Sequence, residues 1–384
     1  MDEQLIGFFY KWNRFEKSND VDIIDFDLLQ QSKNFSGTFS CREEVACELE
    51  RIIRTYEALP EKQSTVQAKL EASLYYLRAL MGQQISFGEY VANTMGIQPK
   101  YIPISALQHQ LSLVRQAYKK IGYTWDKKGI AKFEEEHLLS KEEIEMEYAT
   151  FQKKALPQII QWLGIDIDIN YTITFVDSNE YWMNWIHSDE DGQIHLRCNL
   201  NKRHKWFRGV AEFSVLHEIC AHAVQISMWK EQLRRGNIHP FLGLLSVFSA
   251  EQFSLEGIAE SLSYFYPENL FSDYGLASLQ CDNLAWMVWN NAHIMANTTA
   301  APSEKIAHFV QRYLPDLSRE VIEKNLFEKT QEPLGRTYQY VYGISLYYHL
   351  KLAEKLSNEA KKKYIADSCK KIFTPKEIIQ VCII

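Results

Sequence analysis

The chain has 384 residues, and its 42 basic and 49 acidic residues give a net charge of −7. Apolar residues make up 46% of the sequence, which supplies a large buried core and excludes a mostly disordered chain. The negative balance provides no overall basic field that would hold nucleic acid or an anionic membrane. With only 16 Gly and 10 Pro, the composition favours long helices over a turn-rich β-sandwich.

The first part of the chain carries apolar residues at helical spacing with charged outer faces. This pattern predicts helices at 42–58, 61–82, 105–122 and 140–163. Ser140 followed by Glu142 and Glu143 is typical of a helix start. We expect residues 1–164 to form a helical N-terminal region that acts as a scaffold.

The second part, residues 165–384, begins with a different pattern. YTITFV at 171–176 and QIHLRCNL at 193–200 alternate as strands do, with the turn-like SDEDG at 188–192 between them. A small antiparallel sheet is therefore expected. Helical spacing then predicts helices at 205–234, 250–265, 276–296, 302–313, 318–328 and 333–356. The expected fold class is mainly α with a small antiparallel β-sheet.

The sequence also bears on cellular location. The N-terminus, MDEQLIGFFYKW, has acids where a signal peptide needs cations. The longest apolar run, 241–248, falls far short of the roughly 20 residues that span a bilayer. The seven cysteines are scattered, with no CxxC pair. We therefore expect reduced thiols, a cytoplasmic location and no membrane partner.

The most informative segment is GVAEFSVLHEICAHAVQISMW at 209–229. It is almost entirely apolar, so the predicted helix is expected to be buried on most of its circumference. Ser214, His217, Glu218, His222 and Gln225 nevertheless fall within one arc of roughly 140° on that helix. Unpaired buried charge is costly. A divalent metal ion bound by the two imidazoles and the carboxylate would offset the cost of burying them on one face of the helix.

The spacing of the two histidines adds a structural prediction. Zinc peptidases commonly carry HExxH, whereas His217, Glu218 and His222 form HExxxH, which is one residue longer. In a regular α-helix, residues five apart point about 140° away from each other. A π-turn, with about 4.4 residues per turn, reduces that angle to roughly 50°. The metal hypothesis therefore predicts a distorted helix between 217 and 222.

A third protein ligand is expected from the next strong helix. FSLEGIAESL at 253–262 places Glu256 and Glu260 one turn apart on the same face of an apolar element. Glu256 is the candidate third ligand of a Zn²⁺ ion, and Glu260 is a candidate to orient a ligating histidine. Glu218 is then the candidate general base for metal-assisted hydrolysis. Cys220, between the histidines, is a conceivable ligand, although a small buried residue is the simpler interpretation.

These motifs resemble those of gluzincin-type zinc metallopeptidases. HEICAH at 217–222 has the length of the HExxxH motif of the tyrosine carboxypeptidase family, and Glu256-Gly257-Ile258-Ala259 resembles its EGxA segment. Uncharacterised helical bacterial metallopeptidase-like proteins show a similar order of an Asn-bearing strand, the two motif helices and a late Tyr-x-x-Gly. The resemblance covers residues 165–355. It departs from the bacterial group at Cys220-Ala221, where that group has Pro-Gly, and it carries no signature for tubulin tails.

The resemblance implies further site residues. A late tyrosine would stabilise the oxyanion, and the Tyr-x-x-Gly match favours Tyr340 over Tyr338 and Tyr342. Arg336 is a candidate partner for a substrate carboxylate, and Asn199 is a candidate substrate-binding residue. The gluzincin layout also implies that strand 193–200 is a sheet edge for an extended peptide, although a simple hairpin strand explains it equally well.

Three functions remain open on the sequence. The first is a zinc-dependent peptidase, with the carboxypeptidase type as one form of it, and the second is a zinc-dependent hydrolase of a non-peptide amide or biosynthetic intermediate. Pocket lining, which the sequence does not reveal, separates these two. The third is a non-catalytic helical interaction protein with a vestigial site. Glu218 argues against the third, because a structural zinc site has no use for a base beside a ligand.

Overall fold

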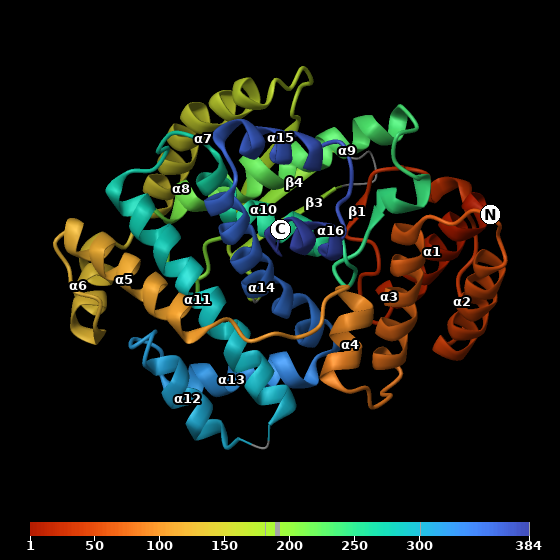
Figure 1. The fold of residues 1–384 in the computed structure, drawn as a ribbon, viewed down its shortest axis with the longest axis horizontal. Coiled ribbons are helices and arrows are strands. Elements are labelled where there is room, and N and C mark those ends of the chain that lie inside the picture. Colours follow the sequence, from red (N-terminus) through yellow and green to blue (C-terminus); the bar gives the residue numbers. More distant parts are fainter. Residues whose placement is uncertain (181, 189–192, 300, 384) are drawn as a thin grey trace.

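Helices dominate the molecule, and a small group of strands lies among them (Figure 1). A computed structural model describes residues 1–180, 182–188, 193–299 and 301–383. The arrangement confirms the expected fold class, mainly α with a small sheet.

The N-terminal part contains seven α-helices and two short elements. These are α1 (Asp2–Lys17), β1 (Phe26–Asp27), the 3₁₀ turn Ser32–Asn34, α2 (Arg42–Glu57), α3 (Ser64–Leu80), α4 (Phe87–Thr94), α5 (Ile104–Lys120), α6 (Lys127–His137) and α7 (Lys141–Leu163). The four predicted helices are confirmed, while α1, α4 and α6 were not predicted. Helix α7 begins at a capping box between Ser140 and Glu143 and ends at Gly164, whose φ of 68° provides a left-handed cap.

The second part holds the sheet and the remaining helices. They are β2 (Tyr171–Val176), β3 (Asn184–Ser188), β4 (Ile194–Asn199), α8 (Val210–Ser214), the π-helix (Val215–Ala223), α9 (Val224–Arg234), the 3₁₀ turn Pro240–Gly243, β5 (Leu244–Leu245), α10 (Gln252–Phe265), α11 (Asp273–Thr298), α12 (Ser303–Gln311), α13 (Arg319–Gln331), α14 (Pro333–Lys355), α15 (Asn358–Ser368) and α16 (Pro375–Ile383). The predicted helices are present, and α15 and α16 are additional. The segment predicted as one helix from 205 begins only after Gly209, at Val210.

The three-stranded sheet has the order β2-β4-β3. Strand β4 pairs antiparallel with β3, whereas β2 and β4, the two predicted strands, pair in parallel. The expectation that those two form an antiparallel hairpin was therefore wrong, because the hairpin partner is the unpredicted β3. Of the turn expected at 188–192, Ser188 ends β3 and the remainder lies outside the described residues.

The interior consists of two hydrophobic clusters. One gathers apolar residues of α4–α7, β4, the π-helix, α10, α11 and α14, and the other gathers those of α1–α3, β5, α9 and the start of α10. Each cluster contains residues from both sides of Gly164. The division at 164 is thus a change in sequence pattern that the packing crosses.

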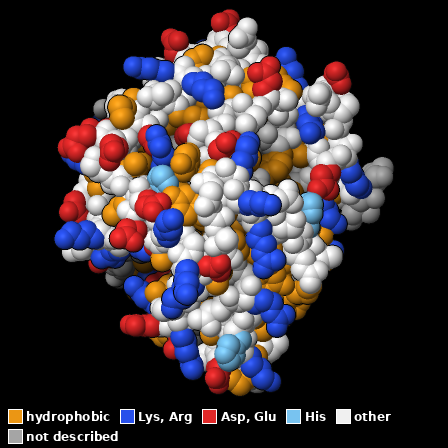
Figure 2. Space-filling model, turned by 90° about the vertical axis from the view of Figure 1, so that its left-hand side faces the viewer, with side chains coloured by type: hydrophobic (Ala, Val, Ile, Leu, Met, Phe, Trp, Pro, Cys, Tyr) orange, Lys and Arg blue, Asp and Glu red, His pale blue; other side chains and the backbone are white. Residues whose placement is uncertain are grey.

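The outer faces of the helices are polar, as their amphipathic patterns require. On the side shown in Figure 2, which is the left-hand side of Figure 1, acidic and basic side chains both occur, with small hydrophobic areas between them. None of the helices in the described part of the chain combines the length and the apolar character needed to cross a bilayer.

Candidate metal centre

The helix that carries HExxxH is distorted where the sequence predicted it. Val215–Ala223 forms a π-helix that joins α8 to α9. The wider turn brings His217 and His222 to the same side, although they are five residues apart. Their rings meet edge to face with centroids 4.7 Å apart. The π-helix is therefore the local feature that makes the site possible.

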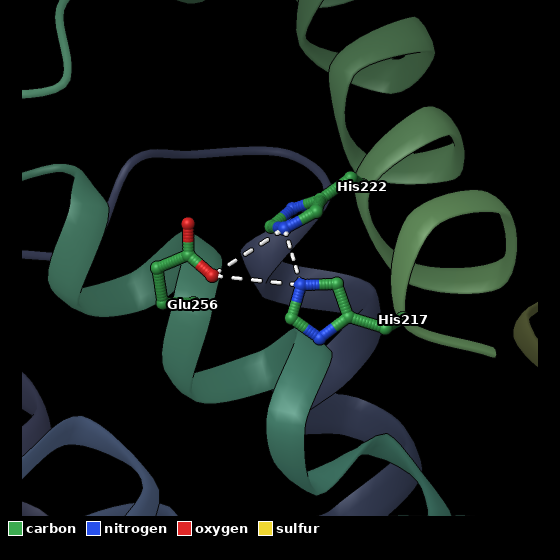
Figure 3. Close-up of side chains that lie close together, drawn as sticks. All are labelled: His217, His222 and Glu256. Atoms are coloured by element: carbon green, nitrogen blue, oxygen red, sulfur yellow. Dashed lines mark hydrogen bonds and ion pairs between the residues drawn. The ribbon is translucent and has the colours of Figure 1, made fainter. Parts of the chain in front are cut away.

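Three donor atoms meet at one point between the π-helix and α10 (Figure 3). The Nε2 atoms of His217 and His222 lie 3.1 Å apart. Each of them lies 3.6 Å from Oε2 of Glu256. All three side chains are buried. The structure thus brings together the three residues that the sequence predicted as ligands.

The geometry fits a small divalent ion. Tetrahedral zinc with ligand bonds of about 2.0–2.2 Å holds its ligand atoms about 3.3–3.6 Å apart. The three observed separations of 3.1, 3.6 and 3.6 Å lie close to that range. Oε2 of Glu256 is buried and has no hydrogen-bond partner among the described residues. Two imidazoles and one carboxylate are also the donor set of catalytic zinc sites, which leave a fourth position open.

The carboxylates of Glu256 and Glu218 favour positive charge at this point, whereas burial opposes it. Burial works against the charged form of His222, but Glu256 and Glu218 outweigh it and raise the pKa of His222. Burial lowers the pKa of His217 to about 3, helped by the neighbouring His222. Burial disfavours ionised Glu256, but His222 and His217 outweigh it and hold its pKa below the usual range. A cation centred between these groups matches this field.

Two further side chains lie against the ligands, Glu260 beside His217 and Tyr338 hydrogen-bonded to Glu256. Oε1 of Glu260 lies 3.4 Å from Nδ1 of His217, on the side of the ring away from Glu256, as expected for an orienting carboxylate. Tyr338 donates a 2.7 Å hydrogen bond to Oε1 of Glu256. The outer oxygen of Glu256 is therefore anchored while Oε2 faces the histidines.

Glu218 lies in the same small cavity as the three donor atoms. The cavity has a volume of about 70 Å³, and its lining also includes Asn184 and Trp185 of β3 and Tyr338 and Tyr342 of α14. Burial raises the pKa of Glu218 to about 7, which His222 partly opposes. A carboxylate with that basicity accepts a proton effectively near neutral pH.

The expected role of Tyr340 was wrong. Its hydroxyl accepts a 2.8 Å hydrogen bond from the backbone N–H of Lys100, and its ring packs against Phe87, away from the cavity. Two residues along a helix point about 200° away from each other, so Tyr338 and Tyr342 face the site instead. Tyr342 donates a 2.7 Å hydrogen bond to the Tyr338 hydroxyl. Their spacing of four residues on one helical face is the signal that separates this pair from Tyr340.

Arg336 also lies away from the metal centre, so its expected contact with a substrate carboxylate was wrong. Its guanidinium donates to Oδ1 of Asn297 at 3.0 Å and to the carbonyl of Ile85 at 2.8 Å, and it covers the ring of Tyr90. These contacts tie α14 to α11 and to the start of α4. Among the described residues that line the cavity there is no Lys or Arg.

Asn199 has a structural role rather than the expected substrate-binding one. It is fully buried, and its Oδ1 accepts from the backbone N–H groups of Ser178 and Asn201, both at 3.1 Å. Its Nδ2 donates to the carbonyls of Ser178 and Trp182. The amide therefore holds the connection between β2 and β3.

The expected peptide-binding edge is also in a different place. Strand β4, which covers most of 193–200, lies between β2 and β3, and both of its edges are paired. The strand at the cavity is β3, an outer strand of the sheet that contributes Asn184, Trp185 and Ile186 to the lining. The alternating sequence pattern predicts a strand, but it does not show which strand of the sheet lies beside the cavity.

One acidic residue at the site was missed entirely. Asp25, just before β1, lines the cavity together with the two histidines and Glu256. Burial and the neighbouring Asp22 and Glu256 raise the pKa of Asp25 to about 8. Asp25 comes from the part of the chain predicted to be a scaffold. The residues around it do not indicate that it packs beside a motif nearly 200 positions further along the chain.

A larger groove shares one lining residue with the cavity. It has a volume of about 900 Å³ and is lined by parts of α9, the segment 28–31 and the segment 167–170. Ile226 of α9 lines both the groove and the cavity. The buried Ile226 side chain therefore lies between the groove and the cavity, and the groove is large enough for part of a substrate chain.

No protein-family model matches this chain. No curated protein matches it closely enough to count as a relative. Among solved structures, the fold is similar to that of a protein from Colwellia psychrerythraea described as a "putative lipoprotein". The TM-score is 0.57 with 11% sequence identity, and the match covers 98% of this chain and 74% of the other. At that identity, the likeness concerns the fold alone.

Proposed function

We propose that this protein is a zinc-dependent hydrolase of amide bonds, with peptides as the main substrate class. The observation that carries the proposal is the meeting of His217, His222 and Glu256 at one buried point beside Glu218. A purely structural ion would not need a carboxylate base in the same cavity. The resemblance of HExxxH and EGxA to the gluzincin motifs supports the same conclusion.

Each residue then has a defined task. When bound, zinc supplies an electrophile for the substrate carbonyl and lowers the pKa of a water molecule at its open position. Glu218 removes a proton from the attacking water, whose oxygen bonds to the carbonyl carbon. The phenol of Tyr342, which donates to the Tyr338 hydroxyl in the structure, turns its O–H to the carbonyl oxygen as that atom gains negative charge. The C–N bond breaks, and the proton held by Glu218 passes to the leaving nitrogen.

The substrate class is supported by the surroundings of the site. The groove of about 900 Å³ that shares Ile226 with the cavity has room for residues of a chain on one side of the scissile bond. The outer strand β3 passes the cavity, and strands in that position bind extended peptides by backbone hydrogen bonds. The carboxypeptidase variant has less support, because Arg336 is engaged elsewhere and no other described cation lines the cavity.

A hydrolase of a small non-peptide amide is the second candidate. The cavity of about 70 Å³ favours it, because this volume accepts only a small group around the reacting carbon. The two candidates share the metal and the base, and they differ in whether the groove is used.

The test combines metal analysis with cleavage of a peptide library. We expect purified protein to retain close to one equivalent of zinc and to cleave a subset of peptides. Glu218→Gln is expected to keep the metal and lose about 10²–10⁴-fold in kcat. Absence of bound metal would contradict the zinc site, and an unchanged rate in Glu218→Gln would contradict the assigned base. Hydrolysis of small amides without any peptide cleavage would favour the second candidate.

We also propose a reducing compartment such as the cytoplasm. All seven cysteines are free in the structure, and four of them are buried. Thiol titration of protein taken directly from cells under native and denaturing conditions tests this, because an oxidising compartment would leave fewer than seven reactive thiols after denaturation.

A further inference from the structure

The cavity holds one carboxylate that the proposed hydrolysis does not use. Its described lining includes three acids, Asp25, Glu218 and Glu256. Glu256 is the candidate ligand and Glu218 the candidate base, which leaves Asp25. In the described part of the chain, the donor atoms that lie within 4.8 Å of one another come from His217, His222 and Glu256 alone. Asp25 therefore stands outside the ligand set.

The backbone around Asp25 is fixed by several hydrogen bonds. Oδ1 of Asn13 accepts from the N–H groups of Ile23 and Ile24 at 2.9 and 3.1 Å. The N–H of Asp25 donates to the carbonyl of Leu245 at 2.9 Å, next to the pairing of β1 with β5. This segment is thus anchored on both sides of Asp25, and the position of its side chain in the cavity is preorganised.

The carboxyl group of Asp25 lies in the lining of the cavity, and the oppositely charged group among the described residues that acts on it is the His222 imidazole, a candidate metal ligand. A carboxylate in a confined site near other acids is costly unless it takes up a proton or a cation balances it. Among the described lining residues, no Lys or Arg provides that cation. The carboxylates of Glu256 and Glu218 already balance the proposed zinc ion, so the remaining source is a group that enters the cavity with the substrate.

We propose that Asp25 binds a cationic nitrogen of the substrate, and that this nitrogen is the α-ammonium group of the substrate's first residue. The inference rests on the proposed function, because it places the ammonium group beside the scissile bond. The small volume of the cavity, about 70 Å³, accepts the end of a chain better than a chain that continues through it. The protein then removes residues from the N-terminus of peptides, or cleaves small amides that carry a free amine.

The test uses two matched pairs of metal-chelating hydroxamates and the zinc-loaded protein. The first pair is leucine hydroxamate and 4-methylpentanohydroxamate, which differ only in the α-amino group. The second pair is Nα-acetyl-lysine hydroxamate and Nα-acetyl-norleucine hydroxamate, which differ in a side-chain ammonium group. Calorimetry gives the affinities for wild type, Asp25→Asn and Asp22→Asn. Asp22 is an exposed acid on the same segment, paired with Lys17 at 3.7 Å, so its variant controls for loss of one charge.

We expect wild type and Asp22→Asn to bind leucine hydroxamate about 10-fold more tightly than its partner without the amine. Asp25→Asn is expected to bind both members equally, with the affinity of the uncharged member unchanged, which also shows that the variant folds and holds zinc. A preference confined to the lysine pair and lost in Asp25→Asn would keep Asp25 as the cation site and overturn the α-ammonium assignment. Equal binding within both pairs, or a preference that survives in Asp25→Asn, would overturn the proposal. If no hydroxamate binds the zinc-loaded protein, the proposed hydrolase site itself fails, which is a separate outcome.

Discussion

His217 and His222 place their Nε2 atoms 3.1 Å apart although they are five positions apart along one helix. A regular α-helix would direct them about 140° away from each other. The π-helix from Val215 to Ala223 absorbs the extra residue and aligns both rings toward Glu256. The site therefore depends on an unusual backbone form, which the buried packing on the other faces of this helix has to stabilise.

Removal of one histidine tests the metal centre. His217→Ala is expected to weaken zinc binding by more than about 100-fold, since loss of a direct ligand costs more than loss of an orienting partner. The fold should survive, because most of the helix surface contacts apolar residues. Plasma mass spectrometry measures the metal, and circular dichroism monitors the fold.

Cys220→Ala is the matched control for that variant. Cys220 lies between the two histidines and is buried, but it does not belong to the group of donor atoms. We expect this variant to retain zinc. Loss of metal in Cys220→Ala would show that the ligand set is incomplete, and unfolding of His217→Ala would indicate a structural ion.

Tyr340 and Tyr342 face opposite sides of α14, so we expect their substitutions by Phe to have different effects. Tyr342→Phe is expected to lower kcat by about 10²-fold with little change in KM, because the phenol contributes mainly when the carbonyl oxygen becomes charged. Tyr340→Phe removes the acceptor for the N–H of Lys100 and is expected to cost about 1 kcal/mol of stability with an unchanged kcat. Steady-state kinetics and urea unfolding of both variants give the comparison. The reverse pattern would restore Tyr340 to the site.

The His349 ring leaves no room for a side chain at position 257, which explains the glycine there. A Cβ atom at this position would lie 2.2 Å from Nδ1 of His349. The His349 ring is held by Ser345 and Tyr364, so it has little freedom to move away. Gly257→Ala is expected to destabilise the protein by about 1–3 kcal/mol and to weaken zinc binding, because α10 carries Glu256 next to it.

Gly88→Ala in α4 is the control for Gly257→Ala. Its added Cβ would meet only Oε1 of Gln98, at 3.9 Å. There the substitution is expected to be neutral or to stabilise the helix by up to about 1 kcal/mol. Thermal unfolding and a competitive zinc chelator measure both quantities. Equal behaviour of the two variants would remove the steric explanation.

A buried lysine outside the site gives a prediction about pH. Lys329 is almost fully buried, donates to Gln339 and lies over the ring of Trp289. Burial lowers its pKa to about 8 from the 10.5 of a free lysine. The folded state therefore binds the proton less readily than the unfolded state, so the stability linked to Lys329 is complete above about pH 10.5 and decreases as the pH falls to about 8.

Lys329→Met tests this linkage. The variant should be more stable than wild type at pH 7 by on the order of 2 kcal/mol, and the difference should shrink as the pH rises toward 10. Urea unfolding at both pH values measures it. A variant that is less stable at pH 7 would show that the contacts of the ammonium group with Gln339 and Trp289 outweigh its desolvation.

The sequence alone determined the features that depend on residues close together in the chain, namely most helices and the faces that their side chains share. Apolar periodicity located most helices, and the spacing of His217 and His222 required a π-helix once a shared metal was assumed. Glu256 and Glu260 were found for the same reason, since residues one turn apart share a helical face. These features depend on near neighbours in the chain, whose relative directions follow from helix geometry.

Only the tertiary structure decided which side chains meet across long distances. It turned Tyr340 into the core and Tyr342 toward the cavity, gave Arg336 and Asn199 structural partners, and placed β4 between two strands. It also brought Asp25 beside a motif nearly 200 residues away. Such meetings depend on how helices rotate and pack against one another, and a shift of two residues in register points a side chain to the opposite face. The spacing of residues within one helix does not determine how that helix is rotated against its neighbours.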